Sequence, residues 1–349
     1  MHRGCTLMEY RQLGRSGVRV SQLCLGTMNF GVSTDEAEAQ RIIDVGIEGG
    51  INFIDTADVY ARGVSEEMTG KALAANGHRD DIVLATKGVA NMGKGPNDRG
   101  ASRYHLTRAV ESSLKRLQTD RIDLYYLHIT DIDTPVEESF DTLDTLVKQG
   151  KILYVGTSKW PVPLVMEALW LSDKHGYPRI VAEQPAYNLS DRRVELELSW
   201  TALRYGIGLC PFGPLAGGVL SGIYRKGQPA PEGHKFKEVG QRDGHRRYTE
   251  ESLDLVEKLI PLAEAKGVTL AEFSLAWLMQ APAVTSPICG PRTAEHVQSS
   301  LKACDVEITE EDRQAVDEAI APGTNVTNYC TLYERMCRAV TKPEPLGPF

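Results

Sequence analysis

Eight short apolar segments alternate with amphipathic segments along the chain, and this alternation constrains the fold more than any other feature. The apolar segments are nearly continuous hydrophobic runs, which is typical of parallel strands buried on both faces. Between them, hydrophobic residues recur at helical spacing, as Phe140, Leu143 and Val147 do. Strands are predicted at 23–25, 52–54, 82–86, 122–127, 152–155, 180–182, 206–210 and 284–288. Eight strand–helix units predict an α/β fold, a closed (β/α)₈ barrel of the TIM type.

Capping and stop signals place the helices between these strands. Ser33 or Thr34 is expected to cap the first helix, and Pro135 is expected in the first turn of another. Further helices are predicted at 65–76, 103–117, 162–173, 192–204 and 249–266, with an extra helix at 269–279 and a last one from 293.

The other segments are assigned to the same domain, which is predicted to span residues 1–349. Residues 1–8 form an extension, and a turn within 10–20 predicts a hairpin that plugs the bottom of the barrel. The segment 222–248 is polar and basic, and it either folds over a cofactor phosphate or is a solvated loop. Residues 322–349 are expected to form an irregular tail at the substrate rim or a subunit contact.

Three of the predicted strands end in polar side chains. Asp55 follows the second strand, Lys87 the third and His128 the fourth, and Tyr60 lies on the loop after Asp55. Because neighbouring strands lie about 4.8 Å apart, these groups are expected at one end of one sheet. Each residue alone is more often a cap, a surface group or a core histidine. Together, at successive strand ends, they favour a catalytic site.

This set of side chains suits the protonation of an oxygen atom. A free phenol has a pKa near 10, and a nearby ammonium makes proton donation easier. Lys87 can supply that cation, Asp55 can hold it, and His128 can donate a hydrogen bond to a carbonyl oxygen. Hydride must then come from elsewhere, which implies a nicotinamide cofactor.

Composition excludes several other classes of protein. The net charge of −8 argues against a nucleic-acid partner. No apolar run approaches 18 residues, so a transmembrane helix is not predicted. The N-terminal residues lack a hydrophobic signal core. The seven scattered cysteines are interpreted as reduced thiols of a cytoplasmic protein. Interaction with a membrane is not expected.

Two alternative types of site find little support in the sequence. His128, Asp131 and Asp133 stand close together, but a catalytic metal needs three or more convergent ligands, so no metal is predicted. No Gly-x-Gly-x-x-Gly turn follows the first strand, which argues against another nicotinamide-binding fold.

The motifs of the chain together resemble the aldo-keto reductase superfamily, in particular its longer bacterial and potassium-channel-β-like members. The resemblance runs in order from about Tyr10 to Thr309. It is carried by Gly26-Thr27-Met28, by 55–60 followed by Ser65-Glu66-Glu67, by Thr86-Lys87, by Leu127-His128 with Asp131, by 150–158 and by 184–189. The family's catalytic tetrad falls on Asp55, Tyr60, Lys87 and His128 without substitution.

The resemblance also implies residues that bind NADPH or NADP⁺. Ser158 and Gln184 are expected to contact the nicotinamide carboxamide, and Phe212 to stack on its ring. Arg292 is expected to bind the 2′-phosphate near the N-terminus of a helix. The implied set is completed by Thr27, Met28, Asp55, Lys159, Gly213, Pro214, Leu215, Gly290, His296, Ser299 and Ser300.

Four of these positions depart from the family's usual residues. Lys159 and Ser300 stand where Asn is more frequent, Gly213 where Ser is, and His296 where Gln or Arg is. These departures bear on cofactor affinity and on the preference for NADPH over NADH.

The sequence therefore predicts an NADPH-dependent reductase that converts an aldehyde, ketone or sugar carbonyl to an alcohol, with Tyr60 as general acid. One alternative is a regulatory subunit that binds nicotinamide and senses redox state with little turnover. Another is a metal-dependent barrel hydrolase. The physiological substrate, the reaction direction and a homo-oligomeric state are left open.

Overall fold

Eight parallel strands form a closed sheet, which confirms the predicted (β/α)₈ barrel. The computed structural model describes residues 8–232 and 247–327. Its strands follow the order β10-β3-β4-β5-β6-β7-β8-β9. Parallel bridges from Leu209 to Val284 and from Phe212 to Ile288 join the two ends of this order. The strands are β3 (Cys24–Gly26), β4 (Phe53–Asp55), β5 (Val83–Gly88), β6 (Ile122–Leu127), β7 (Ile152–Ser158), β8 (Ile180–Gln184), β9 (Gly208–Leu209) and β10 (Ile288–Cys289).

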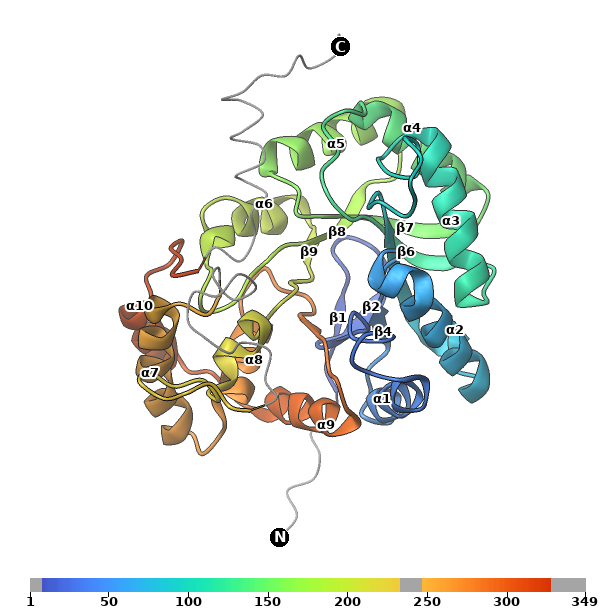
Figure 1. Ribbon diagram of the computed structural model, residues 1–349. Coiled ribbons are helices and arrows are strands. Elements are labelled where there is room, and N and C mark those ends of the chain that lie inside the picture. The colour runs from blue at the N-terminus through green and yellow to red at the C-terminus, as the bar shows by residue number, and fades with distance from the viewer. Residues whose placement is uncertain (1–7, 233–246, 328–349) are drawn as a thin grey trace.

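Helices surround this ring of strands, as Figure 1 shows. They are α1 (Glu36–Glu48), α2 (Val64–Asn76), α3 (Arg103–Leu117), α4 (Val136–Lys148), α5 (Val162–His175), α6 (Leu198–Tyr205), α7 (Glu250–Ala265), α8 (Leu270–Met279), α9 (Ala294–Lys302) and α10 (Glu310–Ala319). The observed bounds of α3 and β6 equal the predicted ones. None of the helices in the described ranges is long and apolar enough to cross a membrane.

Most helix starts lie within one residue of the prediction, but the cap of α1 and the start of α6 do not. The cap of α1 is Asp35, whose carboxylate accepts the N–H of Glu38 at 2.9 Å, and not Ser33 or Thr34. The predicted start of α6 at 192 was wrong, because the N–H of Arg192 bonds the carbonyl of Thr324 at 2.9 Å. That long-range bond, which periodicity cannot reveal, delays α6 until Leu198.

The predicted hairpin is present and lies against the barrel interior. Its strands are β1 (Tyr10–Gln12) and β2 (Arg19–Ser21), paired antiparallel. Leu13 and Val20 are fully buried in the cluster that includes Phe53 and Leu124 of the barrel strands. At Gly14, φ is +56° and a Cβ atom would lie 2.2 Å from the carbonyl oxygen of Val181. The close approach therefore requires glycine at this turn.

Candidate active site

The three predicted strand-end residues lie at the same end of the sheet. Asp55 ends β4, Lys87 is the second-last residue of β5, and His128 directly follows β6. Asp55 stands opposite Ala85, and Lys87 stands opposite Tyr126, so the register brings successive strand ends level. This is the C-terminal end of the barrel, where catalytic groups of such folds lie.

The ammonium group of Lys87 connects three parts of the site. Its Nζ atom donates to Asp55 Oδ1 at 2.5 Å, to the carbonyl oxygen of Thr56 at 2.7 Å and to the Tyr60 hydroxyl at 3.2 Å. The side chains of Lys87 and Asp55 are 0% and 2% exposed. A buried ammonium with these three acceptors has little freedom to move, so it fixes the position of the phenol relative to the carboxylate.

Tyr60 reaches this position through an irregular turn after β4. The N–H of Asp58 bonds the carbonyl of Lys87 at 3.1 Å, which ties the loop to the end of β5. The turn continues as a 3₁₀ segment, Tyr60–Gly63, in which Ala61 and Arg62 have φ of +46° and +55°. Left-handed backbone at such residues costs about 1–2 kcal/mol each. Strain of this kind persists only where the surroundings determine the conformation.

His128, directly after β6, lies beside Tyr60. The two rings meet edge to face, with centroids 5.8 Å apart and planes at 83°. The backbone N–H of His128 bonds the carbonyl of Gly88 at 3.0 Å, which continues the sheet pairing. Its Nδ1 atom is buried without a hydrogen-bond partner among the described residues. Burial, with Lys159 and Lys87 nearby, lowers the pKa of His128 well below its usual value, so the imidazole is neutral at neutral pH.

Burial and charge act in opposite directions on the other members of the site. Burial raises the pKa of Tyr60, and the lowering by Lys87 that the sequence predicted is present but smaller. For Lys87, burial lowers the pKa, but Asp55 and Tyr60 outweigh it and the net direction is upward. Tyr60 is therefore protonated and Lys87 charged at neutral pH, as a proton donor and its cationic neighbour require.

A further contact to Asp55 comes from the far side of the barrel. Gln184, at the end of β8, donates from Nε2 to Asp55 Oδ2 at 2.9 Å, and its side chain is buried. Ser158 Oγ in turn donates to the carbonyl oxygen of Gln184 at 3.0 Å. The sequence placed Gln184 and Ser158 at the cofactor but did not reveal the bond to Asp55. The only sequence signal for this bond was that both residues stand at predicted strand ends. That signal does not show which side chains bond to each other.

Comparison with known proteins agrees with this geometry. A family model described as "Aldo/keto reductase family" matches residues 22–321, which is most of the chain. The chain belongs to the aldo/keto reductase family.

Individual relatives cover nearly all of the chain. A Bacillus subtilis (strain 168) protein named "Uncharacterized oxidoreductase YrpG" is 39% identical over 325 residues, 90% of this chain and 97% of that protein. Proteins named "Probable voltage-gated potassium channel subunit beta" from Arabidopsis thaliana and from Oryza sativa subsp. japonica are each 38% identical over 302 residues, 86% of this chain and 92% of theirs. The chain is thus an oxidoreductase of the aldo/keto reductase family.

A second lysine of this aldo/keto reductase lies at the mouth of the site. Lys159 directly follows β7 with φ of +59°, and its Nζ atom lies 3.4 Å from the carbonyl oxygen of His128. The same ammonium lies 5.4 Å from the ring centroid of Phe212. The structure therefore brings together Lys159 and Phe212, two of the residues predicted to contact the cofactor.

The loop after β9 in this aldo/keto reductase is held by the segment after β8. The side-chain amide of Asn188 donates to the carbonyl oxygen of Gly213 at 3.0 Å, and the N–H of Phe212 bonds the carbonyl of Pro185 at 2.9 Å. Gly213 has φ of +66°, which favours glycine there. Pro214 is buried, and Leu215 is partly buried. Asn188 thus positions the loop that contains Gly213. The sequence analysis included Asn188 only within the motif 184–189.

The predicted phosphate region of this aldo/keto reductase lies after β10, next to β3. Asn29 donates to the carbonyl oxygen of Gly290 at 2.9 Å, which links the loops after β3 and β10. Arg292 is exposed, and its backbone N–H bonds Nδ1 of His296 at 3.3 Å. The first amide of α9, from Ala294, is bonded to Glu38 at 2.7 Å. Because the Ala294 N–H is already bonded to Glu38, an anion at this position would be bound mainly by the Arg292 side chain.

The remaining predicted contacts differ in accessibility. Thr27 is fully buried and bonds Ser65 at 2.7 Å, whereas Met28 is 54% exposed. Ser299 and Ser300 are partly exposed on α9. The bond to Ser65 thus fixes Thr27 in the loop after β3, and its contact with a cofactor stays a prediction.

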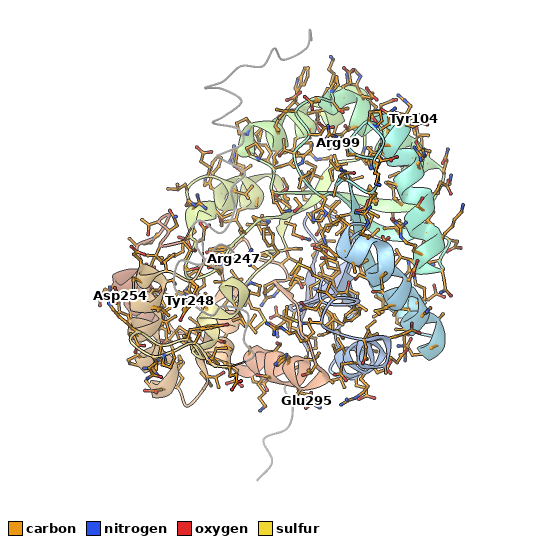
Figure 2. The ribbon with its side chains drawn as sticks, viewed as in Figure 1. Arg99, Tyr104, Arg247, Tyr248, Asp254 and Glu295 are labelled. Carbon is orange, nitrogen blue, oxygen red and sulfur yellow. The ribbon has the colours of Figure 1, made fainter. Side chains whose placement is uncertain are left out.

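The described part of the basic segment 222–248 does not present free positive charge. Arg225 makes a bidentate contact with Glu257 of α7 at 2.8 and 2.7 Å, and Lys226 pairs with Asp254. Figure 2 shows Asp254 on α7 together with Tyr248 and Arg247 at the other end of the segment. Residues 233–246 of this segment and residues 1–7 and 328–349 lie outside the described residues.

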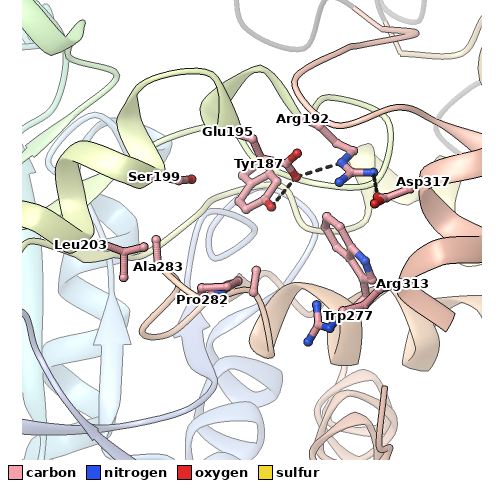
Figure 3. Close-up of a pocket in the computed structure, with 11 residues that line it drawn as sticks. Tyr187, Arg192, Glu195, Ser199, Leu203, Trp277, Pro282, Ala283, Arg313 and Asp317 are labelled. Atoms are coloured by element: carbon pink, nitrogen blue, oxygen red, sulfur yellow. Dashed lines mark hydrogen bonds and ion pairs between the residues drawn. The ribbon is translucent and has the colours of Figure 1, made fainter. Parts of the chain in front are cut away.

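A cavity of about 280 Å³ lies elsewhere in the aldo/keto reductase, between the segment after β8, α8 and α10 (Figure 3). Three of its four charged groups contact one another, and the fourth, Arg313, donates to the carbonyl oxygen of Gln280 at 2.8 Å. Arg192 bonds Glu195 at 2.8 Å and Asp317 at 2.7 Å, and the Tyr187 hydroxyl donates to Glu195 at 2.6 Å. These contacts hold the C-terminal segment to the barrel, so the cavity is interpreted as a packing feature and not as the reaction site.

Proposed function

We propose that the protein is an NADPH-dependent carbonyl reductase acting on an aldehyde, a ketone or an open-chain sugar. The observation that carries this proposal is the contact of the Lys87 ammonium with both Asp55, at 2.5 Å, and the Tyr60 hydroxyl, at 3.2 Å. A protonated phenol beside a charged ammonium at the end of a barrel is suited to donate a proton to a carbonyl oxygen. No group in this set is arranged to act as a nucleophile.

The residues around the tetrad fit a nicotinamide cofactor. The Gln184 amide nitrogen is committed to Asp55 at 2.9 Å, so its amide oxygen can accept from a carboxamide N–H. The aromatic face of Phe212 lies next to the same opening as Lys159. Arg292 is exposed beyond β10, where its fork can bind a 2′-phosphate. NADPH would supply the hydride, which carries two electrons to the carbonyl carbon and leaves NADP⁺.

The chain's own residues would complete the reduction. The Tyr60 O–H bond breaks as its proton passes to the carbonyl oxygen, which becomes the alcohol hydroxyl, and the phenolate regains a proton from solvent. Lys87 stabilises that phenolate at 3.2 Å, and Asp55 keeps the ammonium in place. The neutral imidazole of His128, whose ring lies 5.8 Å from the Tyr60 ring, donates a hydrogen bond to the substrate oxygen.

The experiment that tests this proposal is the Tyr60→Phe substitution, which removes only the hydroxyl. We expect turnover with a panel of aldehydes and ketones to fall at least about a hundredfold, by the usual size of general-acid effects. Binding of NADPH, followed by fluorescence titration, should persist. Unchanged turnover in Tyr60→Phe would refute the assigned role of the phenol.

A second candidate is a nicotinamide-binding regulatory subunit with little turnover. It is favoured by the 38% identity to proteins named as probable potassium channel β subunits, over 92% of their length. Rapid multiple-turnover oxidation of NADPH by any carbonyl in the panel would favour the reductase. Tight NADPH binding without turnover across the whole panel would favour the regulatory subunit.

A further inference from the structure

A fully buried carboxyl group, that of Glu183, lies behind the turn that follows β7. One of its oxygens accepts the N–H of Trp160 at 3.1 Å, and the other accepts the Thr157 hydroxyl at 2.5 Å. Between these two donors stand Ser158 and Lys159, which are both among the predicted cofactor contacts.

We propose that Glu183 is a positioning residue for the nicotinamide end of the cofactor. It would hold the turn 157–160 in the conformation that binds the ring and its carboxamide. The inference rests on the proposed function, since it assumes that a nicotinamide binds beside the tetrad.

The register of the sheet places Glu183 beside this turn but outside the reaction site. In the pairing of β7 with β8, Thr157 stands opposite Glu183, and Ser158 stands opposite Gln184. Successive side chains of a strand point to opposite faces of the sheet. The Gln184 side chain points inward and donates to Asp55 at 2.9 Å, so the Glu183 side chain points toward the surrounding helices. Glu183 therefore acts on the turn from behind and not from within the reaction site.

The turn needs such support because its backbone is strained. Lys159 has φ of +59°, a left-handed conformation that residues other than glycine keep only where their surroundings determine it. Its N–H bonds the carbonyl of Gln184 at 3.2 Å, and its own carbonyl accepts from Thr130 at 3.3 Å. The Glu183 carboxyl adds one bond before the strained residue and one after it. Loss of these two bonds would let the turn relax and would move the groups that face the cofactor.

An acid at this buried position is costly to the fold. Burial raises the pKa of Glu183 to about 7, although the donors of the turn act in the opposite direction. An apolar side chain would fill the same space without the cost of burying a polar group. The acid is therefore explained by the groups that donate to it and not by packing alone.

Substitution of Glu183 tests the proposal. We would measure by calorimetry the Kd of NADPH and of 2′-phospho-ADP-ribose, which is NADPH without its nicotinamide. Glu183→Leu loses both acceptors, so the Kd of NADPH should rise at least about tenfold. Glu183→Gln keeps one oxygen acceptor, so its rise should be smaller. The Kd of 2′-phospho-ADP-ribose should change less than about twofold in both variants, because this fragment lacks the ring that the turn would bind.

Steady-state kinetics separates this role from a general structural one. In Glu183→Leu the KM for NADPH should rise with its Kd, whereas kcat at saturating NADPH should stay within about threefold of the wild type, because the tetrad is unchanged. A general loss of structure would instead weaken both ligands and lower kcat.

The hydroxyl that donates to Glu183 gives a matched pair of variants. Thr157→Ser keeps this donor and should keep the wild-type Kd of NADPH, whereas Thr157→Val keeps the shape without the donor and should raise it. Glu272→Leu is the remote control, because the Glu272 carboxyl holds the start of α8 by accepting the Thr269 N–H at 2.8 Å. It should lose thermal stability and keep the Kd of NADPH.

The outcomes separate the inference from the proposed function. If Glu183→Leu and Thr157→Val bind NADPH as the wild type does, or weaken NADPH and the fragment equally, the inference is overturned and the proposed function stands. If the wild type does not bind NADPH, the proposed function itself fails, and the inference fails with it.

Discussion

The Lys87 ammonium lies 3.2 Å from the Tyr60 hydroxyl, although the two residues are separated by 27 positions and lie on different elements. The loop after β4 crosses to the end of β5 and is tied there by the bond from the Asp58 N–H to the Lys87 carbonyl, at 3.1 Å. The same lysine contacts Asp55 at 2.5 Å. One buried side chain therefore fixes the position of the phenol relative to the carboxylate.

Replacing this side chain should affect turnover and stability separately. In Lys87→Met we expect turnover to fall at least about a hundredfold, because the phenolate loses its cation. We also expect a loss of roughly 3–5 kcal/mol in the free energy of unfolding, because Asp55 is left buried without its partner. Urea denaturation and steady-state kinetics measure the two effects. The double variant Asp55→Asn/Lys87→Met should regain part of the stability and none of the turnover, and recovered turnover would contradict the role given to Lys87.

The pH dependence of carbonyl reduction follows from two pKa directions. Burial raises the pKa of Tyr60 above 10.0, so the phenol keeps its proton through neutral and mildly alkaline pH. The pKa of His128 lies well below 6.5, so the imidazole stays neutral down to mildly acidic pH. We expect kcat/KM for reduction to be nearly constant between about pH 6.5 and 9, and alcohol oxidation to rise with pH as the phenolate forms. A fall in reduction centred near pH 7 would contradict this assignment.

The bond from Gln184 to Asp55 predicts a positioning role at the end of β8. Gln184→Leu removes the donor at 2.9 Å, so Asp55 holds Lys87 less firmly and turnover should fall about tenfold. Gln280→Leu is the matched control. The Gln280 side chain bonds Val306 at 2.7 Å and Ile308 at 3.1 Å. That variant should lose stability in thermal unfolding and keep its turnover, so equal losses of turnover in both variants would argue against a specific role for Gln184.

Asp58 predicts a pH-dependent stability. Both of its carboxylate oxygens are buried without a partner among the described residues, and burial, with Glu66 nearby, raises its pKa from 3.8 to about 7. Between pH 4 and 7 the unfolded chain is ionised at this group and the folded chain is not, so Asp58 destabilises the fold increasingly as pH rises through this window. Asp58→Asn lacks this penalty.

Asp58→Asn should therefore gain stability relative to the wild type as pH rises. The gain in the free energy of unfolding should be on the order of 2–4 kcal/mol larger at pH 8 than at pH 4. Chemical denaturation at the two pH values measures this. A difference that does not change with pH would show that Asp58 is ionised and solvated in the folded protein.

Local patterns in the sequence determined the elements and the strand-end residues. The pattern of the chain predicted α3 to its observed bounds, and an apolar run did the same for β6. Apolar runs placed the other strands near their observed positions, although β10 overlaps the predicted 284–288 only at Ile288. Asp55, Lys87 and His128 were found because strand ends in a parallel barrel lie at one face. These features depend on residues close together in the chain, where spacing is informative.

Only the tertiary structure decided which polar groups meet. Gln184 bonds Asp55 across 129 positions of sequence, and the Lys159 ammonium reaches the carbonyl of His128 across 31. The delayed start of α6 depends on a bond from Arg192 to Thr324. Such contacts follow from closure of the sheet, which brings non-neighbouring strands together at one opening. The physical reason is that periodicity reports the direction of a side chain relative to its own element, whereas partners and net charge depend on the elements across the barrel.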